Sequence, residues 1–146
     1  MARLPEPRPG LVIAYSYLWE SEYRAGQEEG AKDRPCAIVI ATRMEDGDVV
    51  VTVAPITHRP PKDSRHGVEL PTDVKHRLGL DEKRSWIICT ELNRFVWPGP
   101  DLRPVSRSKP GQFAYGTLPR STMLLVFQQL IGLRAERRPV IVVRPS

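Results

Sequence analysis

Arg34 stands where a polar loop meets an apolar strand, and this position suits it to hold an anion. Pro35 follows it directly and leads into the apolar run Cys36-Ala37-Ile38-Val39-Ile40-Ala41. Pro35 keeps the backbone of Arg34 extended, because the pyrrolidine ring clashes with a helical conformation of the preceding residue. The apolar run predicts a strand buried on both faces or nearly so. A guanidinium on such a rigid support can bind two phosphate oxygens; the alternative is an ordinary surface arginine at the end of a loop.

A hydroxyl and an imidazole leave a second predicted strand soon after the first. The β-branched run at residues 49–54 predicts this strand, and Pro55-Ile56-Thr57-His58 follows it. RNA carries its own nucleophile, the 2′-hydroxyl, so an enzyme that cleaves it needs a base, an acid and donors for the phosphorane charge, but no metal. Thr57 could hold a phosphate oxygen or orient the 2′-hydroxyl. Glu29 or His58 could transfer protons, since a free imidazole titrates closest to neutral pH.

Basic side chains cluster just after Thr57, and the whole chain is basic, with a net charge of +5 and a pI near 9.6. This excess of positive charge favours an anionic partner. The predicted substrate contacts are Arg59, Lys62 and Arg65, with Trp19 of the long connection 16–33 as a surface on which a base could stack. The alternatives are a solvated basic loop and an aromatic residue that packs the connection onto the sheet.

The order of these features resembles the MazF/PemK/Kid family of toxin ribonucleases. The residues that carry the resemblance, between about positions 9 and 58, are Gly26, Glu29, Gly30, Arg34, Pro35, Pro55, Ile56 and Thr57. The segments 85–93 and 97–100 resemble a divergent branch of the same group. The resemblance implies an SH3-like small barrel with helical additions and a functional pair formed by Arg34 and Thr57. It also implies a functional role for the acidic residue of the first loop, Glu29, as in some members of the family.

Two departures from the family pattern affect what can be carried over. The usual short first loop is replaced here by residues 17–23, and Glu28 competes with Glu29 for the acidic role. The identity of the acid and the base therefore stays open among Glu28, Glu29 and His58, and the family's preferences for RNA sequence do not transfer. His58 is a candidate from its own chemistry alone.

The leading hypothesis is a metal-independent endoribonuclease toxin of a toxin–antitoxin pair that cuts single-stranded RNA. The resemblance implies a homodimer, silenced by a small acidic antitoxin, and it implies no cofactor. The three histidines, His58, His66 and His76, lack metal-ligand spacing, so no metal is expected. The alternatives are a non-catalytic module that binds nucleic acid or protein on the same barrel, and a gyrase-poisoning toxin.

The length of 146 residues predicts a single domain, 1–146, with an extended arm at 1–9. A hydrophobic fraction of 40% and a charged fraction of 27% are typical of soluble globular proteins. No apolar run approaches 18 residues and no apolar signal core follows Met1, so we expect a cytoplasmic protein without membrane association. Cys36 and Cys89 lie in apolar runs, and we expect buried free thiols, not a disulfide or a catalytic thiol.

Short strands separated by Gly/Pro turns predict a mainly β fold, a small barrel or sandwich with one C-terminal helix. Strands are expected at 11–15, 36–41, 49–54, 68–70, 86–92, 113–118 and 139–144. A hairpin turn is expected at 45–48, a helical segment at 72–78 before Gly79, and a helix at 122–135 with Ser121 as its N-cap. The expected core residues are Ile38, Val39, Ile40, Val51, Val53, Ile87, Leu125, Phe127 and Val142.

Overall fold

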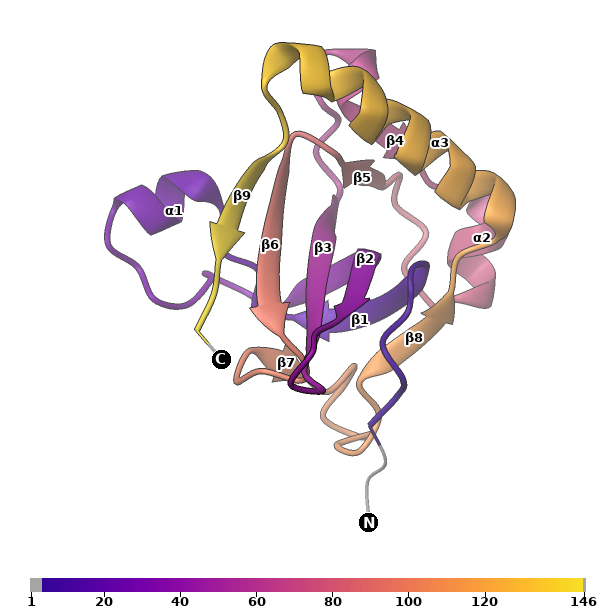
Figure 1. Ribbon diagram of the computed structural model, residues 1–146. Helices are drawn as coiled ribbons and strands as arrows, with labels where there is room; N and C mark the ends of the chain where they lie inside the picture. The colour runs from indigo at the N-terminus through magenta and orange to yellow at the C-terminus, as the bar shows by residue number, and fades with distance from the viewer. Residues whose placement is uncertain (1–3, 146) are drawn as a thin grey trace.

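One hydrogen-bonded sheet of nine strands with three helices makes up the chain from residue 4 to residue 145, the part that the computed structural model describes (Figure 1). The strands are β1 (Leu11–Tyr15), β2 (Arg34–Arg43), β3 (Val49–Thr57), β4 (Gly67–Glu69), β5 (Trp86–Ile88), β6 (Glu91–Val96), β7 (Leu102–Arg103), β8 (Ala114–Thr117) and β9 (Val140–Val143). The helices are α1 (Glu20–Arg24), α2 (Thr72–Arg77) and α3 (Arg120–Gly132), with 3₁₀ turns η1 (Ser64–His66) and η2 (Leu133–Glu136). The prediction of a mainly β fold with a C-terminal helix is confirmed.

The long antiparallel hairpin β2–β3 forms the centre of the sheet. Strand β1 pairs with β2, while β5 and β6 both pair with β3 at different points along it. The path runs β4-β5-β3-β2-β1-β7, with β8 beside β1 and β9 parallel to β6. Between the strands of residues 4–145 no pairing joins β4 to β7, so the sheet stays open where a closed barrel was expected.

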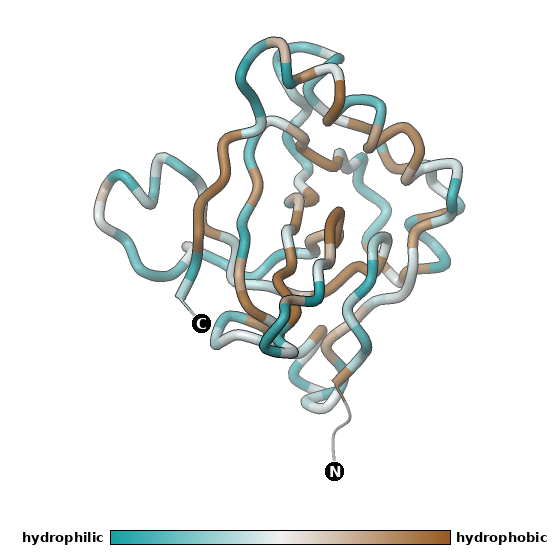
Figure 2. The backbone as a smooth tube through the Cα atoms, in the orientation of Figure 1, coloured by the Kyte–Doolittle hydropathy of each residue, from teal (hydrophilic) through white to brown (hydrophobic). Residues whose placement is uncertain are grey.

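The middle of the β2–β3 hairpin is buried on both faces, which accounts for its continuous apolar runs. Side chains alternate between two hydrophobic clusters: Ala37 and Val39 belong to one, and Cys36 and Ile38 belong to the other. Figure 2 shows the hydrophobic stretches concentrated on these central strands. Six of the nine predicted core residues are buried, namely Ile38, Val39, Val51, Val53, Ile87 and Val142, and Phe127 is partly buried against the core.

Two predicted core residues, Ile40 and Leu125, are instead exposed, at 45% and 52%. The register of β2 on β3 shifts between Ile38 and Ile40, so Val39 takes the core position and Ile40 points outward. Helix α3 begins at Arg120 with Pro119 at its N-cap, so the predicted cap at Ser121 is wrong. The buried positions of α3 are Thr122, Met123 and Val126, which leaves Leu125 on the solvent side.

The predicted strand at 86–92 is two strands separated by Cys89 and Thr90. Strand β5 pairs Ile87 with Ile56, and β6 pairs Asn93 with Val53 further along β3, so extra residues interrupt the register. The connection 16–33, predicted as a loop, contains the short helix α1. The interruption between β5 and β6 matters for function, because it brings Thr90 and Glu91 to the cavity described below.

Replacing Ile38 with Ala is expected to lower the free energy of unfolding by about 2–5 kcal/mol, because it opens a cavity in a closely packed cluster. The matched change Ile40→Ala is expected to cost below about 1 kcal/mol, since that side chain is half exposed. Urea unfolding of both variants measures the difference. Equal losses for the two would contradict the register shift.

Cys36 and Cys89 are buried free thiols, as predicted. Burial raises the pKa of Cys89 to about 12 and also raises that of Cys36, so neither thiol is a ready nucleophile. None of the helices within residues 4–145 is long and apolar enough to span a membrane.

Candidate functional site

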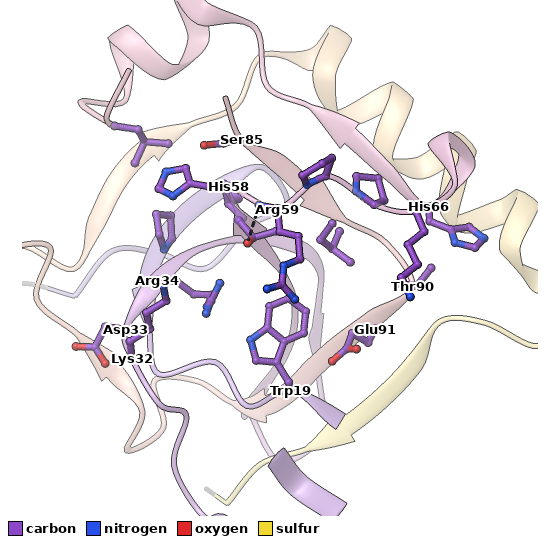
Figure 3. A pocket seen from close by; sticks show the side chains of 18 of the residues that line it. Trp19, Lys32, Asp33, Arg34, His58, Arg59, His66, Ser85, Thr90 and Glu91 are labelled. Carbon is purple, nitrogen blue, oxygen red and sulfur yellow. Dashed lines mark hydrogen bonds between the residues drawn. The ribbon is translucent and has the colours of Figure 1, made fainter. Parts of the chain in front are cut away.

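A cavity of about 870 Å³ lies where the start of β2, the end of β3 and the start of β6 meet the connection 16–33. Figure 3 shows its side chains converging from these separate segments. Six of the eight predicted site residues line it: Trp19, Arg34, Thr57, His58, Arg59 and Lys62. Residues far apart in the sequence therefore share one hollow in the surface.

Arg34 and Thr57 are brought together by the register of the central hairpin. Cys36 lies opposite Pro55 and Ala37 opposite Ala54, so the same register continued to the strand ends sets Arg34 opposite Thr57. Cross-strand neighbours have Cβ atoms about 4.5–5.5 Å apart. The guanidinium and the hydroxyl can therefore act on the same group.

The Arg34 guanidinium lies over the ring of Trp19, 5.0 Å from the ring centroid. Its Nε is buried and has no hydrogen-bond partner, and within residues 4–145 Arg34 forms no ion pair. A buried donor without a partner costs free energy until it finds an acceptor. This arrangement leaves a forked cation in the cavity, ready to bind an oxyanion.

The connection 16–33 is fixed to the sheet, and this holds Trp19 at the cavity wall. Asn93 accepts from the backbone N–H of Leu18 at 2.9 Å and donates to the Leu18 carbonyl at 2.8 Å. Trp19 donates its backbone N–H to Glu22 Oε1 at 3.0 Å. At Gly30 the chain passes so close to Tyr17 that any Cβ would overlap the Tyr17 carbonyl oxygen. Glycine is therefore required at position 30 to close the loop.

His58 is held by a carboxylate that is itself anchored. Its Nε2 lies 2.8 Å from Asp81 Oδ2, and Asp81 Oδ1 accepts from the buried ammonium of Lys75 at 3.0 Å. Partial burial alone would raise the pKa of Asp81, but the hydrogen bond from Lys75 and the charges of His58 and Lys75 hold it below its usual value. Asp81 therefore stays ionised and fixes the orientation of the imidazole.

Glu91 is a half-buried carboxylate at the opposite side of the cavity from His58 (Figure 3). Its Oε1 accepts the backbone N–H of Glu20 at 2.9 Å. Burial raises the pKa of Glu91, and the negative charges of Glu20 and Glu22 add to the shift. The hydrogen bonds from the Glu20 N–H and from the Tyr17 side chain oppose it. Such a carboxyl is closer than an ordinary one to the range in which it can exchange protons near neutral pH.

Replacing Glu91 with Gln is expected to stabilise the fold near neutral pH. The pKa of Glu91 is raised on folding, so its stabilising contribution is complete below its usual value of 4.5 and is lost as pH rises through the folded-state pKa. Glutamine still accepts the Glu20 N–H but cannot ionise. Thermal unfolding should give a higher Tm for Glu91→Gln near neutral pH and little difference below pH 4.5. A lower Tm at neutral pH would show that ionised Glu91 is stabilising.

Two predicted site residues lie apart from the cavity lining. Glu29 is exposed, and its Oε1 lies 3.9 Å from Arg103 Nη2. Of the three acid–base candidates that the sequence left open, His58 lines the cavity with Arg34 and Thr57, whereas Glu28 and Glu29 do not. Arg65 is bound to Asp63, with Nη2 2.6 Å from Oδ2, and these hydrogen bonds lower the pKa of Asp63. Arg65 lies in η1 and lines a separate groove that is formed by η1, β4 and α3.

Sequence reasoning missed Asp81 and Glu91. Asp81 follows α2 in a segment without regular secondary structure, and only its proximity to His58 in space reveals a role. Glu91 lay inside a run expected to be one continuous strand, where an acidic residue signals only a solvent-facing position. The strand breaks at Cys89 and Thr90, and the sequence pattern did not indicate this break. Within residues 4–145 no group of three or more His, Cys, Asp and Glu side chains is placed to hold a metal ion.

Comparison with known proteins adds no identification of the chain. No protein-family model matches the sequence, and no curated protein matches it either.

Proposed function

We propose that this protein is a metal-independent endoribonuclease that cleaves single-stranded RNA, on a divergent SH3-like fold of the MazF/PemK/Kid toxin type. The observation that carries the proposal is the Arg34 guanidinium, which has no ion-pair partner among residues 4–145 and lines a cavity together with Thr57. Phosphodiester cleavage needs such a preorganised donor where negative charge develops. The mainly β fold and the C-terminal helix are compatible with this fold type.

In the proposed reaction the 2′-hydroxyl of one nucleotide attacks its own 3′-phosphate. Arg34 donates two hydrogen bonds to non-bridging oxygens of the phosphorane, and Thr57 holds a further oxygen or orients the attacking hydroxyl. The P–O5′ bond breaks and leaves a 2′,3′-cyclic phosphate and a 5′-hydroxyl. No metal or cofactor takes part in these steps.

The cavity walls favour an unpaired strand as substrate. Arg59 and Lys62 flank the Arg34 site and can neutralise neighbouring phosphates. Trp19, whose ring carries the Arg34 guanidinium, lines the cavity and gives an aromatic contact to a base that is free to turn out of a stack. Binding is expected to weaken steeply with rising salt, because the affinity rests largely on phosphate contacts.

A function as a toxin would also involve partner proteins. A homodimer and a small acidic antitoxin that covers the basic cavity belong to the proposal through the family resemblance. The excess of positive charge, +5 overall, is consistent with an acidic partner.

The proposed function is tested by asking whether cleavage depends on the 2′-hydroxyl of the RNA. The protein is incubated with a single-stranded RNA and with a matched oligonucleotide of the same sequence carrying 2′-O-methyl groups. We expect cleavage of the RNA only, with both oligonucleotides bound at similar affinity. Cleavage of the methylated strand would exclude 2′-hydroxyl attack, and binding of both without cleavage of either would favour a non-catalytic binding module.

A further inference from the structure

We propose that Glu91 and His58, on facing sides of the cavity, are the proton-transfer groups of RNA cleavage, with Glu91 as base, His58 as acid and Asp81 as the residue that positions His58. The inference rests on the proposed function and assigns the two roles that Arg34 and Thr57 leave unfilled. Both side chains line the cavity, whereas Glu29, the acidic candidate suggested by the sequence, points to Arg103 outside it. Figure 3 shows Arg59 and Trp19 between the two groups in projection.

Three carboxylates line the cavity, and two of them are already engaged by cationic side chains. Asp33 Oδ1 lies 3.7 Å from Arg103 Nε, and Asp81 is held between His58 and Lys75. Glu91 forms no ion pair within residues 4–145; its Oε1 accepts a backbone N–H, and the Tyr17 side chain is a further polar neighbour of the carboxylate. Among these three, Glu91 is the carboxylate that is free to accept a proton from a 2′-hydroxyl.

The imidazole of His58 is oriented in the manner of a catalytic histidine. Asp81 contacts Nε2 at 2.8 Å, and within residues 4–145 no hydrogen bond engages Nδ1. The buried Lys75 holds Asp81 from the other side, so the carboxylate cannot swing away. A base or acid with a fixed orienting partner is the arrangement that proton transfer requires.

His66 is the other imidazole at the cavity, and its contacts direct it elsewhere. Its Nε2 lies 3.8 Å from Asp63 and 3.6 Å from Glu136, which ties it to η1 and η2. In the described part of the chain, no carboxylate lies within hydrogen-bond distance of this imidazole. His58 is therefore the better-placed acid.

The step balances without any further reactant. Glu91 takes the proton of the 2′-hydroxyl while O2′ forms its bond to phosphorus. The P–O5′ bond breaks, and the proton on His58 passes to O5′, which leaves as a hydroxyl. Water exchange afterwards returns the proton from Glu91 and restores it on His58, so the enzyme ends as it began.

The pH dependence follows from the charges around each group. Glu91 faces the carboxylates of Glu20 and Glu22 on α1 and the side chain of Tyr17. His58 faces Asp81, and through it Lys75 of α2, while Arg34 and Arg59 also line the cavity. Cleavage should need Glu91 ionised and His58 protonated, which gives a bell-shaped profile of kcat/KM against pH.

The experiment compares single-turnover cleavage of one RNA by the parent protein, Glu91→Gln and His58→Gln across the pH range. Each variant is expected to lose about 10²–10⁴-fold in rate while binding a 2′-O-methyl RNA as tightly as the parent does. Glu91→Gln should lose the acidic limb of the profile, and His58→Gln the alkaline limb. Asp81→Asn should lower kcat with KM little changed, as a positioning residue does.

Matched controls are Glu69→Gln and His76→Gln, which change the same residue types outside the cavity. Both should cleave like the parent. If the parent cuts RNA and Glu91→Gln or His58→Gln cuts within about threefold of it, with both limbs retained, the acid–base assignment is wrong and the proposed function stands. If the folded parent binds RNA but cuts none at any pH, the proposed function falls, and this assignment falls with it.

Discussion

Replacing Arg34 with Ala is expected to slow RNA cleavage by about 10²–10³-fold, the usual loss for one preorganised donor to a developing oxyanion. The guanidinium forms no ion pair with the described residues and its Nε lacks a partner, so little in the folded protein depends on it. Arg34→Ala should therefore unfold near the parent's temperature. Binding of RNA should weaken less than cleavage, because Arg59 and Lys62 still contact phosphates.

Two further variants sharpen this prediction. Arg34→Lys should also cleave poorly, since a point charge cannot replace the planar fork or its stacking on Trp19. Arg43→Ala, at the exposed far end of the same strand, removes an equal charge away from the cavity and should cleave like the parent. Single-turnover rates on one RNA give the comparison. An Arg34→Ala protein as fast as the parent would remove Arg34 from the reaction.

Replacing Arg144 with Met is expected to lower the free energy of unfolding by about 3–5 kcal/mol, because it removes the closer of the two arginines beside the buried Asp101 carboxylate and leaves several buried acceptors without their donor. Arg144 is 3% exposed, and its Nη2 lies 3.1 Å from Asp101 Oδ2. Its Nη1 donates to the Ser16 carbonyl at 2.7 Å, and its Nη2 to the Glu28 carbonyl at 3.1 Å. The side chain thus ties β9 to both ends of the connection that carries Trp19.

Urea unfolding measures this loss, with Arg134→Met as an exposed control that should change stability by at most about 0.5 kcal/mol. The double change Asp101→Asn with Arg144→Met should recover part of the loss, since no unpaired charge remains. Arg144→Met should also cleave RNA more slowly in conditions where it stays folded, because the loop behind Trp19 loses its anchor. A loss below about 1 kcal/mol would contradict the anchoring role.

The sheet was predictable wherever a local pattern decides structure. Residues 11–15 match β1 in full, and the β2–β3 hairpin follows from two apolar runs and the Asp46-Gly47 turn, with Gly47 at a φ of 92°. The helical segment predicted before Gly79 is α2, which ends at Arg77. Gly79 follows it with a φ of 70°, as is common just after a helix. Arg34 and Thr57 line one cavity because both stand at the ends of adjacent strands.

Features that depend on long-range geometry could not be read from the sequence. The register shift that exposes Ile40 and the break between β5 and β6 arise from pairing with β3, and no local residue pattern marks them. The choice of acid and base was open for the same reason. Glu29 stood in the expected position along the chain, but Arg103 lies near it, while Glu91 reaches the cavity from a different strand.

The most direct measurement is incubation of the purified protein with a long RNA in excess EDTA, followed by chemical mapping of the cut ends. We predict cleavage at unpaired positions that leaves 2′,3′-cyclic phosphate and 5′-hydroxyl ends, and that is slowed by about 10²–10³-fold in Arg34→Ala. Intact RNA with the folded parent protein, or cuts that carry 5′-phosphate ends, would contradict a metal-independent ribonuclease that works through the 2′-hydroxyl.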